Sequence, residues 1–308
     1  MIPLNRRGPA ILARKIRRWF EPDLDPARVE RVFAEFDDQR GYAAWHARCR
    51  AALERPLPVR ERPGPVVAQG FAVEQVLSRE AAAGLLAEAR GERQPGRLKL
   101  DSAKLEGYGL DDPSLVRRLA EGALTPAVDA HCLEFFRSEY FVYWCTLSRT
   151  APVAGPANVS FMWHCDRGPR AHLKLLLYLN DHSEHGGGTS YLDLAASDAV
   201  ARSGYVFARG RRRTGSLEEL SALAGRPLAA HEHLPRAGDA VLFQPARVLH
   251  SGITPRSGPR YVFTLCLLPS PLPWSVALER STRIDLRSHP IWHDDAGDLA
   301  QGFALPGG

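Results

Sequence analysis

The spacing of apolar positions predicts helices in the first part of the chain. Asp25 followed by Pro26 is typical of a helix start, and Val29 and Phe33 then repeat at helical spacing. Residues 10–54 are predicted to be helical, with a separate helix over 42–53, and the proline-rich stretch 55–65 predicts an extended linker. Further on, the pattern predicts a strand at 66–76, helices at 78–90, 113–121 and 126–138, and a loop over 91–112.

The pattern changes at Tyr140, after which short segments rich in aromatic and β-branched residues alternate with turn-forming residues. These predicted strands cover 140–148, 159–166, 172–180, 189–194, 240–245 and 260–268. Residues 195–237 interrupt them as an insertion with a short helix over 217–223. We therefore predict an α+β fold: a double-stranded β-helix (a cupin-like jelly roll) with flanking helices and an N-terminal helical extension.

Three parts follow from this division. Residues 1–65 form the N-terminal helical extension and proline-rich linker, 66–285 the jelly-roll domain, and 286–308 a C-terminal tail. Leu12, Ile16, Trp19 and Phe20 share one face of a basic helix. Packing of that face against the protein is the favoured interpretation, and peripheral contact of residues 10–20 with an anionic membrane surface is the alternative.

Composition narrows the class of protein. Apolar residues make up 44% and charged residues 24% of the 308 positions, which is ordinary for a globular protein and excludes a disordered chain. The net charge is +5, but the arginine clusters at 6–18 and 209–213 lack interleaved aromatic residues, so no nucleic-acid partner is predicted. Five cysteines without a CxxC pair indicate reduced thiols and a cytoplasmic location. The oligomeric state is left open.

The candidate chemistry begins at His164-Cys165-Asp166. On a strand, residues two apart point to the same face, so His164 and Asp166 can reach one metal ion. Two ligands leave a site incomplete, and His250 is the best third candidate because it lies between two predicted strands. Two histidines and one carboxylate make the facial triad of non-haem iron(II) oxygenases.

Arg260 leads the strand that follows His250, and Thr264 shares its strand face. A guanidinium binds a carboxylate through two parallel hydrogen bonds and keeps its charge when buried. Arg260 is therefore the candidate anchor for the distal carboxylate of a 2-oxo acid cosubstrate, and Thr264 is a candidate second donor.

This arrangement resembles the iron(II)/2-oxoglutarate-dependent dioxygenase superfamily. The motifs that carry the resemblance are HxD, GGGT at 186–189, GDAVLF at 238–243, HSG at 250–252 and GPRYVFT at 258–264. They are similar to prolyl-hydroxylase-like members, whereas the long interval from HxD to the second histidine is closer to phytanoyl-CoA dioxygenase-like members.

The resemblance implies Fe(II), 2-oxoglutarate and O₂ as cofactor and cosubstrates, with His164, Asp166 and His250 as catalytic metal ligands. It also implies hydroxylation of an unactivated C–H bond in a small-molecule, lipid or sugar substrate, with release of succinate and CO₂. The carboxylate of Asp166 favours hydroxylation, since halogenating relatives lack it. Leu177 stands where oxygen-sensing relatives have a cosubstrate-binding tyrosine, so Tyr143, Ser148 and Lys174 are the candidates to fill that part of the pocket.

The same residues allow other interpretations. A non-catalytic jelly-roll module that binds a ligand, and a metal hydrolase with the same ligands, remain alternatives. His231-Glu232-His233 could offer two ligands on one strand face, but it lies in a polar insertion and is interpreted as surface. His182 and His185 are interpreted as solvated residues of a turn beside three glycines.

Overall fold

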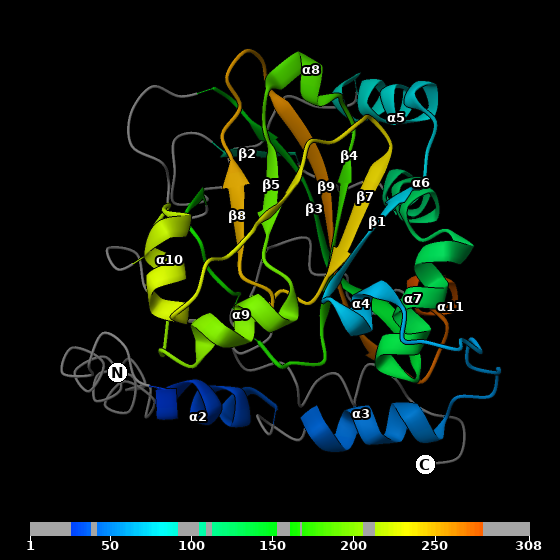
Figure 1. Ribbon diagram of the computed structural model, residues 1–308. Coiled ribbons are helices and arrows are strands. Elements are labelled where there is room, and N and C mark those ends of the chain that lie inside the picture. The colour runs from blue at the N-terminus through cyan, green and yellow to red at the C-terminus, as the bar shows by residue number, and fades with distance from the viewer. Residues whose placement is uncertain are drawn as a thin grey trace, which may run out of the picture.

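Two antiparallel sheets form the centre of an α+β fold (Figure 1). The computed structural model describes residues 26–37, 42–91, 105–108, 113–152, 161–166, 168–205 and 213–279. Residues 10–20, the arginines at 209–212 and the predicted tail at 286–308 lie outside these ranges. Within the described chain, the helices are α2 Pro26–Asp37, α3 Tyr42–Ala51, α4 Pro65–Ala68, α5 Arg79–Gly91, α6 Pro113–Ala123, α7 Pro126–Phe136, α8 His182–His185, α9 Leu194–Ala201, α10 Leu217–Ala224 and α11 Trp274–Glu279.

The strands divide between a larger and a smaller sheet. The larger sheet has the order β1-β7-β4-β9-β3-β2 and contains β1 Phe71–Gln75, β2 Leu105–Tyr108, β3 Glu139–Thr150, β4 Leu173–Tyr178, β7 Asp239–Phe243 and β9 Arg260–Ser270. The smaller sheet has the order β6-β5-β8 and contains β5 Gly188–Tyr191, β6 His231–His233 and β8 His250–Ile253. An isolated bridge pairs His164 with His250 at its edge. The chain thus builds β1 to β4 in the larger sheet and β5 and β6 in the smaller sheet, and β7, β8 and β9 then alternate between the two. This arrangement of two sheets is the double-stranded β-helix that the sequence predicts.

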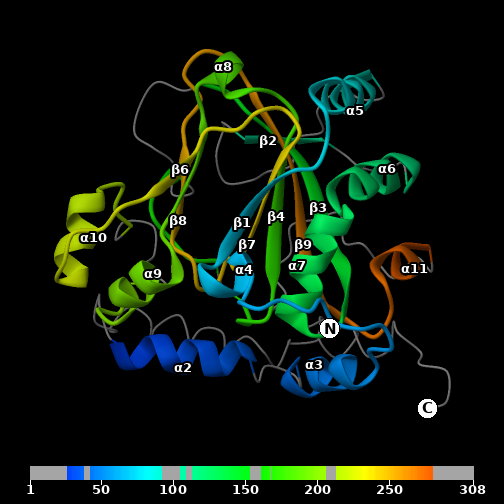
Figure 2. The same cartoon turned by 45° about the vertical axis from the view of Figure 1, so that its right-hand side comes forward.

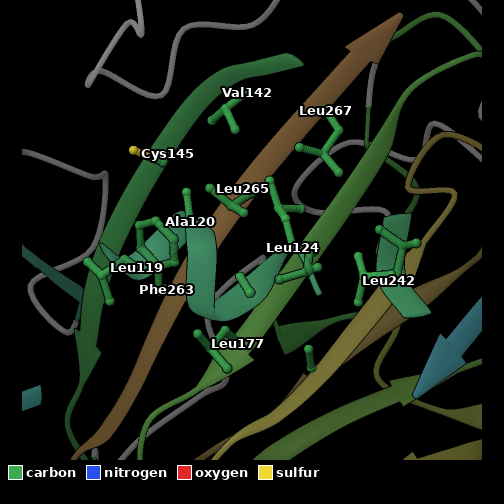
Figure 3. Close-up of a cluster of buried hydrophobic side chains, with 14 of the residues drawn as sticks. Leu119, Ala120, Leu124, Val142, Cys145, Leu177, Leu242, Phe263, Leu265 and Leu267 are labelled. Carbon is green, nitrogen blue, oxygen red and sulfur yellow. The ribbon is translucent and has the colours of Figure 1, made fainter. Parts of the chain in front are cut away.

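The outer face of the larger sheet builds the main core. Leu175 lies opposite Leu265 and Leu177 opposite Phe263 in the antiparallel register of β4 and β9. These side chains pack with Leu119 and other apolar residues of the flanking helices, as Figure 3 shows. Burial of each such leucine contributes about 1.5–3 kcal/mol. Since side chains alternate along a strand, the intervening positions of β4 and β9 face the smaller sheet.

The helices cover the sheets from several sides. Figures 1 and 2 both place α5, α6 and α7 beside the larger sheet, and α9 and α10 on the side of the smaller sheet. Along the lower edge, α2 packs through Val29 and Phe33 into an apolar cluster with Trp163. The indole Nε1 of Trp45 in α3 donates a hydrogen bond of 3.0 Å to the carbonyl of Pro269 in β9. The described helices of the N-terminal extension thus contact the β domain directly.

Four predicted elements differ from the structure. The described part of the strand expected at 159–166 forms an isolated bridge at His164 instead of a strand, and the loop expected over 91–112 contains β2. The single strand expected at 66–76 is instead the short helix α4 followed by β1, with the turn at Gly70 in a left-handed conformation (φ 96°). Residues 231–233, expected in a polar insertion without a strand, form β6 because they pair with β5. Local polarity concealed that strand, since an edge strand exposed to solvent needs few apolar residues. The predicted short helix at 217–223 is confirmed as α10.

Gly238 in the turn before β7 allows a stability test. It has a φ of 90°, and an added Cβ would lie 2.1 Å from the carbonyl oxygen of Leu77. We expect Gly238→Ala to lower the free energy of unfolding by roughly 1–3 kcal/mol, because alanine adds both strain and a clash. Gly84→Ala is the matched control, since nothing lies within 4 Å of its added Cβ. Its exposed position in α5 should make the alanine stabilising by about 0.5–1 kcal/mol. Equal urea midpoints for the two variants would contradict this interpretation.

Candidate metal centre

A pair of backbone hydrogen bonds brings the two predicted histidine ligands together. The His164 N–H donates to the carbonyl of His250 at 3.0 Å, and the His250 N–H donates back to that of His164 at 2.9 Å. In such a pair, directly opposed side chains lie on the same side. The two imidazole centroids are 4.3 Å apart as a result.

Each imidazole is held with one nitrogen toward the centre of the site. His164 Nδ1 lies 2.7 Å from the carbonyl oxygen of Met162, and His250 Nδ1 lies 2.9 Å from that of Val248. A carbonyl oxygen only accepts, so both Nδ1 atoms carry the proton and both Nε2 atoms keep a lone pair. A hydrogen bond at the other ring nitrogen is how proteins orient metal-binding histidines.

The Asp166 carboxylate completes the cluster. Its Oδ1 lies 3.7 Å from His164 Nε2 and 3.9 Å from His250 Nε2. Over the described residues, these three side chains form the group whose ligand atoms all lie within 4.8 Å of one another. One oxygen and two nitrogens at this spacing suit a divalent cation between them.

Burial keeps the histidines in the form that binds metals. It lowers the pKa of His164 to about 4 and that of His250 to about 3, so both are neutral at pH 7. Burial raises the pKa of the Asp166 carboxyl, but the positive charge of Lys174, with a further contribution from the two imidazoles, outweighs this and holds that pKa well below its usual range. Two neutral imidazoles and one carboxylate therefore meet at one point.

Lys174 is paired with the second carboxylate oxygen of Asp166. Its Nζ forms an ion pair and hydrogen bond with Asp166 Oδ2, and it lies 5.8 Å from the ring centroid of Trp144. Oδ1 is the oxygen that faces the histidines, so the lysine leaves one carboxylate oxygen for a cation. The sequence suggests Lys174 as a cosubstrate residue, but the structure places its charge on the ligand carboxylate.

Arg260 lies buried at the start of β9 without a carboxylate partner among the described residues. Its Nη1 donates to the carbonyl of Gly188 and, at 3.3 Å, to that of Ile253. Its Nε is buried without a hydrogen-bond partner. A buried guanidinium with an unused donor is costly unless an anion binds it, because burial opposes the charged form and lowers its pKa.

Thr264 lies on the same face of β9 as Arg260 and is also buried. Directly across the sheet it pairs with Thr146 of β3, whose Oγ1 is buried without a partner. Sequence reasoning missed Thr146, because only the register of β3 against β9 reveals that it is opposite Thr264. Two hydroxyls and one guanidinium thus share the inner face of the sheet.

The remaining cosubstrate candidates lie elsewhere or are already engaged. Tyr143 packs in an apolar cluster with Tyr42 and Trp45 of α3. Ser148 Oγ donates to the carbonyl of Val262 at 3.3 Å. Leu177 faces the outer core, so its side chain does not enter the barrel.

The other histidines separate into surface and buried groups. His231 and Glu232 are exposed, as predicted for that motif, although His233 is partly buried 3.6 Å from Asp239. The solvated position expected for His185 is wrong: its side chain is fully buried, and its Nδ1 accepts from the Gly187 N–H at 2.9 Å. The glycines beside it suggested an open turn, but α8 folds that segment inward.

The thiols fit the sequence analysis, which predicts reduced cysteines. All five cysteines are free and buried, and burial raises the pKa of Cys165 well above its ordinary value. Cys165 is therefore a packing residue beside the ligands. No helix in the described ranges is both long and apolar enough to cross a membrane.

No family model and no curated protein matches the chain. Similar solved structures include HygX from Streptomyces hygroscopicus with nickel and 2-oxoglutarate, at 16% identity and a TM-score of 0.44 over 69% of this chain and 88% of that one. EctD from S. alaskensis with 2-oxoglutarate and 5-hydroxyectoine has 16% identity and a TM-score of 0.49, over 70% and 79%. The 2-oxoglutarate-dependent epimerase SnoN has 16% identity and a TM-score of 0.44, over 73% and 81%. These values are low, so the function proposed below depends on the geometry of this chain.

Lys174 gives the first test of the site. We expect Lys174→Met to weaken Mn(II) binding by about tenfold or more, because Asp166 loses the group that holds its second oxygen. Lys174→Arg keeps the charge and should retain much of the affinity. Calorimetric titration measures both, with thermal unfolding as the check on folding. Equal affinity in the Met variant and the wild type would show that the ion pair does not position Asp166.

Acid should destabilise the metal-free protein through its buried histidines. Burial lowers the pKa of His164, His172 and His185 to about 4 and that of His250 to about 3. The unfolded chain binds these protons near pH 6.5. The free energy of unfolding should therefore fall as the pH drops from about 6.5 to 4, and these groups should contribute no slope above that window. Urea denaturation across this range tests the expectation, and His250→Gln should give a shallower slope. An unchanged slope in that variant would contradict it.

Proposed function

We propose that the chain is an iron(II)- and 2-oxoglutarate-dependent oxygenase. The observation that carries the proposal is the grouping of His164 Nε2, His250 Nε2 and one oxygen of Asp166 around a single point. Two histidines and one carboxylate leave the other coordination positions of an iron ion open, as non-haem iron oxygenases require. A structural zinc site would instead close a tetrahedron with a fourth protein ligand.

Arg260 supports 2-oxoglutarate as the cosubstrate. Its buried guanidinium has an unused Nε donor and no carboxylate partner in the described chain. The distal carboxylate of 2-oxoglutarate would supply the missing anion and accept charge-assisted hydrogen bonds. Thr264 and Thr146 lie opposite each other on the same inner face and would offer hydroxyl donors to that carboxylate.

When bound, iron(II), 2-oxoglutarate and O₂ together supply oxidative decarboxylation to succinate and CO₂ and the oxidation of an unactivated C–H bond. The chain contributes position and exclusion of water. Lys174 holds Asp166 with one oxygen toward the histidines, and the Nδ1 hydrogen bonds orient both imidazoles. The two sheets enclose Arg260, which strengthens its attraction for an anion because few waters screen it.

Hydroxylation is the reaction that we favour within this class. With a metal bound, the Asp166 carboxylate would fill the position that a halide would need, which argues against halogenation. The substrate that we propose is a small molecule, with lipid-linked and sugar-containing compounds included. A lipid-linked substrate would involve the amphipathic segment 10–20, which lies outside the described residues.

The test is cosubstrate turnover by the purified chain. Under anaerobic conditions, iron(II) and 2-oxoglutarate should together give a weak visible charge-transfer band, because the 2-oxo acid chelates the metal. On admission of O₂, succinate should form. Asp166→Ala should abolish both signals. Arg260→Met should raise the KM for 2-oxoglutarate roughly 10- to 100-fold, the value of a lost charge-assisted interaction.

Arg226→Met is the matched control. Arg226 is exposed, and its guanidinium donates a hydrogen bond of 3.4 Å to the carbonyl of Ala195. It should leave both signals unchanged. An iron-loaded wild type that gives neither a band nor succinate would contradict the proposal. Hydrolytic activity with bound zinc would then favour the metal hydrolase alternative.

A further inference from the structure

A surface pocket lies where the ends of α3 and α7 meet the segment that follows α3. It has a volume of about 550 Å³, which is within the usual range for small-molecule sites. Its lining consists of four apolar side chains and two arginines: Ala47, Ala51, Leu53, Leu57, Arg50 and Arg137. The pocket therefore combines an apolar wall with two positive charges, and it shares no residue with the candidate metal centre.

A contact between two helices brings the two arginines to the same pocket. His46 Nε2 of α3 lies 2.8 Å from the carbonyl oxygen of Phe136, the last residue of α7. Arg50 follows His46 by four residues and so lies on the same side of α3, and Arg137 directly follows Phe136. Figure 2 shows α3 beneath α7. Both arginines thus extend from backbone positions that the packing of α3 on α7 holds together.

The acidic side chains of α7 and of the start of β3 are already paired with other arginines. Arg55 binds two of them, since its Nη1 lies 2.7 Å from Oδ2 of Asp129 and its Nε lies 2.5 Å from Oε1 of Glu139. Arg60 Nε lies 3.5 Å from Oε2 of Glu134, the other acidic residue of α7. These three carboxylates are therefore neutralised by residues outside the pocket.

The guanidinium groups of Arg50 and Arg137 have no carboxylate partner among the residues that the structure describes. Helix α3 itself contains no acidic residue. Glu54, which follows the pocket residue Leu53, is exposed and forms an ion pair with neither arginine. An anion that enters the pocket would therefore meet two guanidinium groups whose charge no protein side chain neutralises.

The backbone of Arg137 indicates that its side chain has a role besides folding. Arg137 caps α7 in the left-handed conformation, with φ 53° and ψ 31°, and its N–H donates to the carbonyl of Leu133 at 2.8 Å. Glycine is the usual residue at such a cap, because a Cβ atom is unfavourable there. Within the described ranges, Arg137 is the non-glycine residue with a positive φ. Residues held in such conformations cluster at binding sites.

We infer that this pocket binds a phosphate ester, with the phosphate between Arg50 and Arg137 and the apolar part of the ester against Leu53 and Leu57. A guanidinium binds a phosphate through two parallel hydrogen bonds, and two guanidinium groups balance its charge of about −2 at pH 7. A soluble phosphate ester and the headgroup of a phospholipid share this chemistry. The inference does not depend on the proposed function, since it uses no residue of the metal centre.

Calorimetric titration of the full chain with hexyl phosphate tests the inference. The wild type should bind hexyl phosphate saturably, and it should bind inorganic phosphate more weakly because that anion has no apolar chain. Arg50→Gln should weaken hexyl phosphate binding about tenfold or more, the value of a lost charge-assisted interaction. Arg48→Gln is the matched control and should match the wild type. Arg48 is exposed on the same helix, with its guanidinium 5.5 Å from the ring centroid of Trp45, and it does not line the pocket.

Arg137→Gly separates binding from stability. Glycine adopts a positive φ without strain, so this variant should unfold at a higher temperature than the wild type. It should nevertheless bind hexyl phosphate about tenfold more weakly, because it lacks one guanidinium. The inference is overturned if the wild type does not bind hexyl phosphate, if Arg50→Gln and Arg137→Gly keep the wild-type affinity, or if Arg48→Gln loses as much affinity as they do.

Cosedimentation with phosphatidylcholine vesicles that contain phosphatidic acid then identifies the source of the ester. Retention of the wild type that Arg50→Gln lacks would assign the pocket to a phospholipid headgroup. Equal behaviour of the two chains would assign it to a soluble phosphate ester.

Discussion

The two reciprocal hydrogen bonds between His164 and His250 are the constraint on which the site depends. They join a short segment with little regular structure to the start of β8, and they do so through backbone atoms alone. Both imidazoles then extend from one pair of positions, and Asp166, two residues along, reaches the same point. On the other side of this segment, the side chains of Trp163 and Cys165 pack against α2, α9 and α10. The helices outside the barrel therefore help to place the ligands inside it.

Two cationic side chains, Lys174 and Arg260, lie inside the barrel near this bridge. Burying Lys174 and Arg260 costs free energy, and the protein offsets it differently for each. Lys174 forms an ion pair with Asp166, and this pair offsets the free energy of burying the ammonium group. Arg260 donates to two carbonyls and lies 5.8 Å from the centroid of the Phe161 ring, but it has no carboxylate partner in the described chain. This difference supports the proposed roles of Lys174 at the metal centre and of Arg260 as the anchor of an anionic cosubstrate.

Sequence reasoning found His164, Asp166 and His250 because each lies in a motif with a strong local pattern, and the structure brings all three together. It could not find Thr146, since its relation to Thr264 depends on which residues of β3 and β9 pair. Nor could it place Lys174 on Asp166, although it named the lysine. Such contacts depend on the register of paired strands and on long-range contacts, and the local spacing of residues predicts neither. The jelly roll itself was predictable, because strands and turns alternate visibly after Tyr140.

The most direct test of the central claim is the position of iron in crystals grown anaerobically with Fe(II), located by anomalous scattering at the iron edge. We expect one strong peak per chain, bonded to His164 Nε2, His250 Nε2 and one oxygen of Asp166, with the other oxygen on Lys174. The remaining positions should be held by solvent or an added 2-oxo acid. A peak at other residues, a fourth protein ligand on the iron, or no peak at the triad would contradict the account.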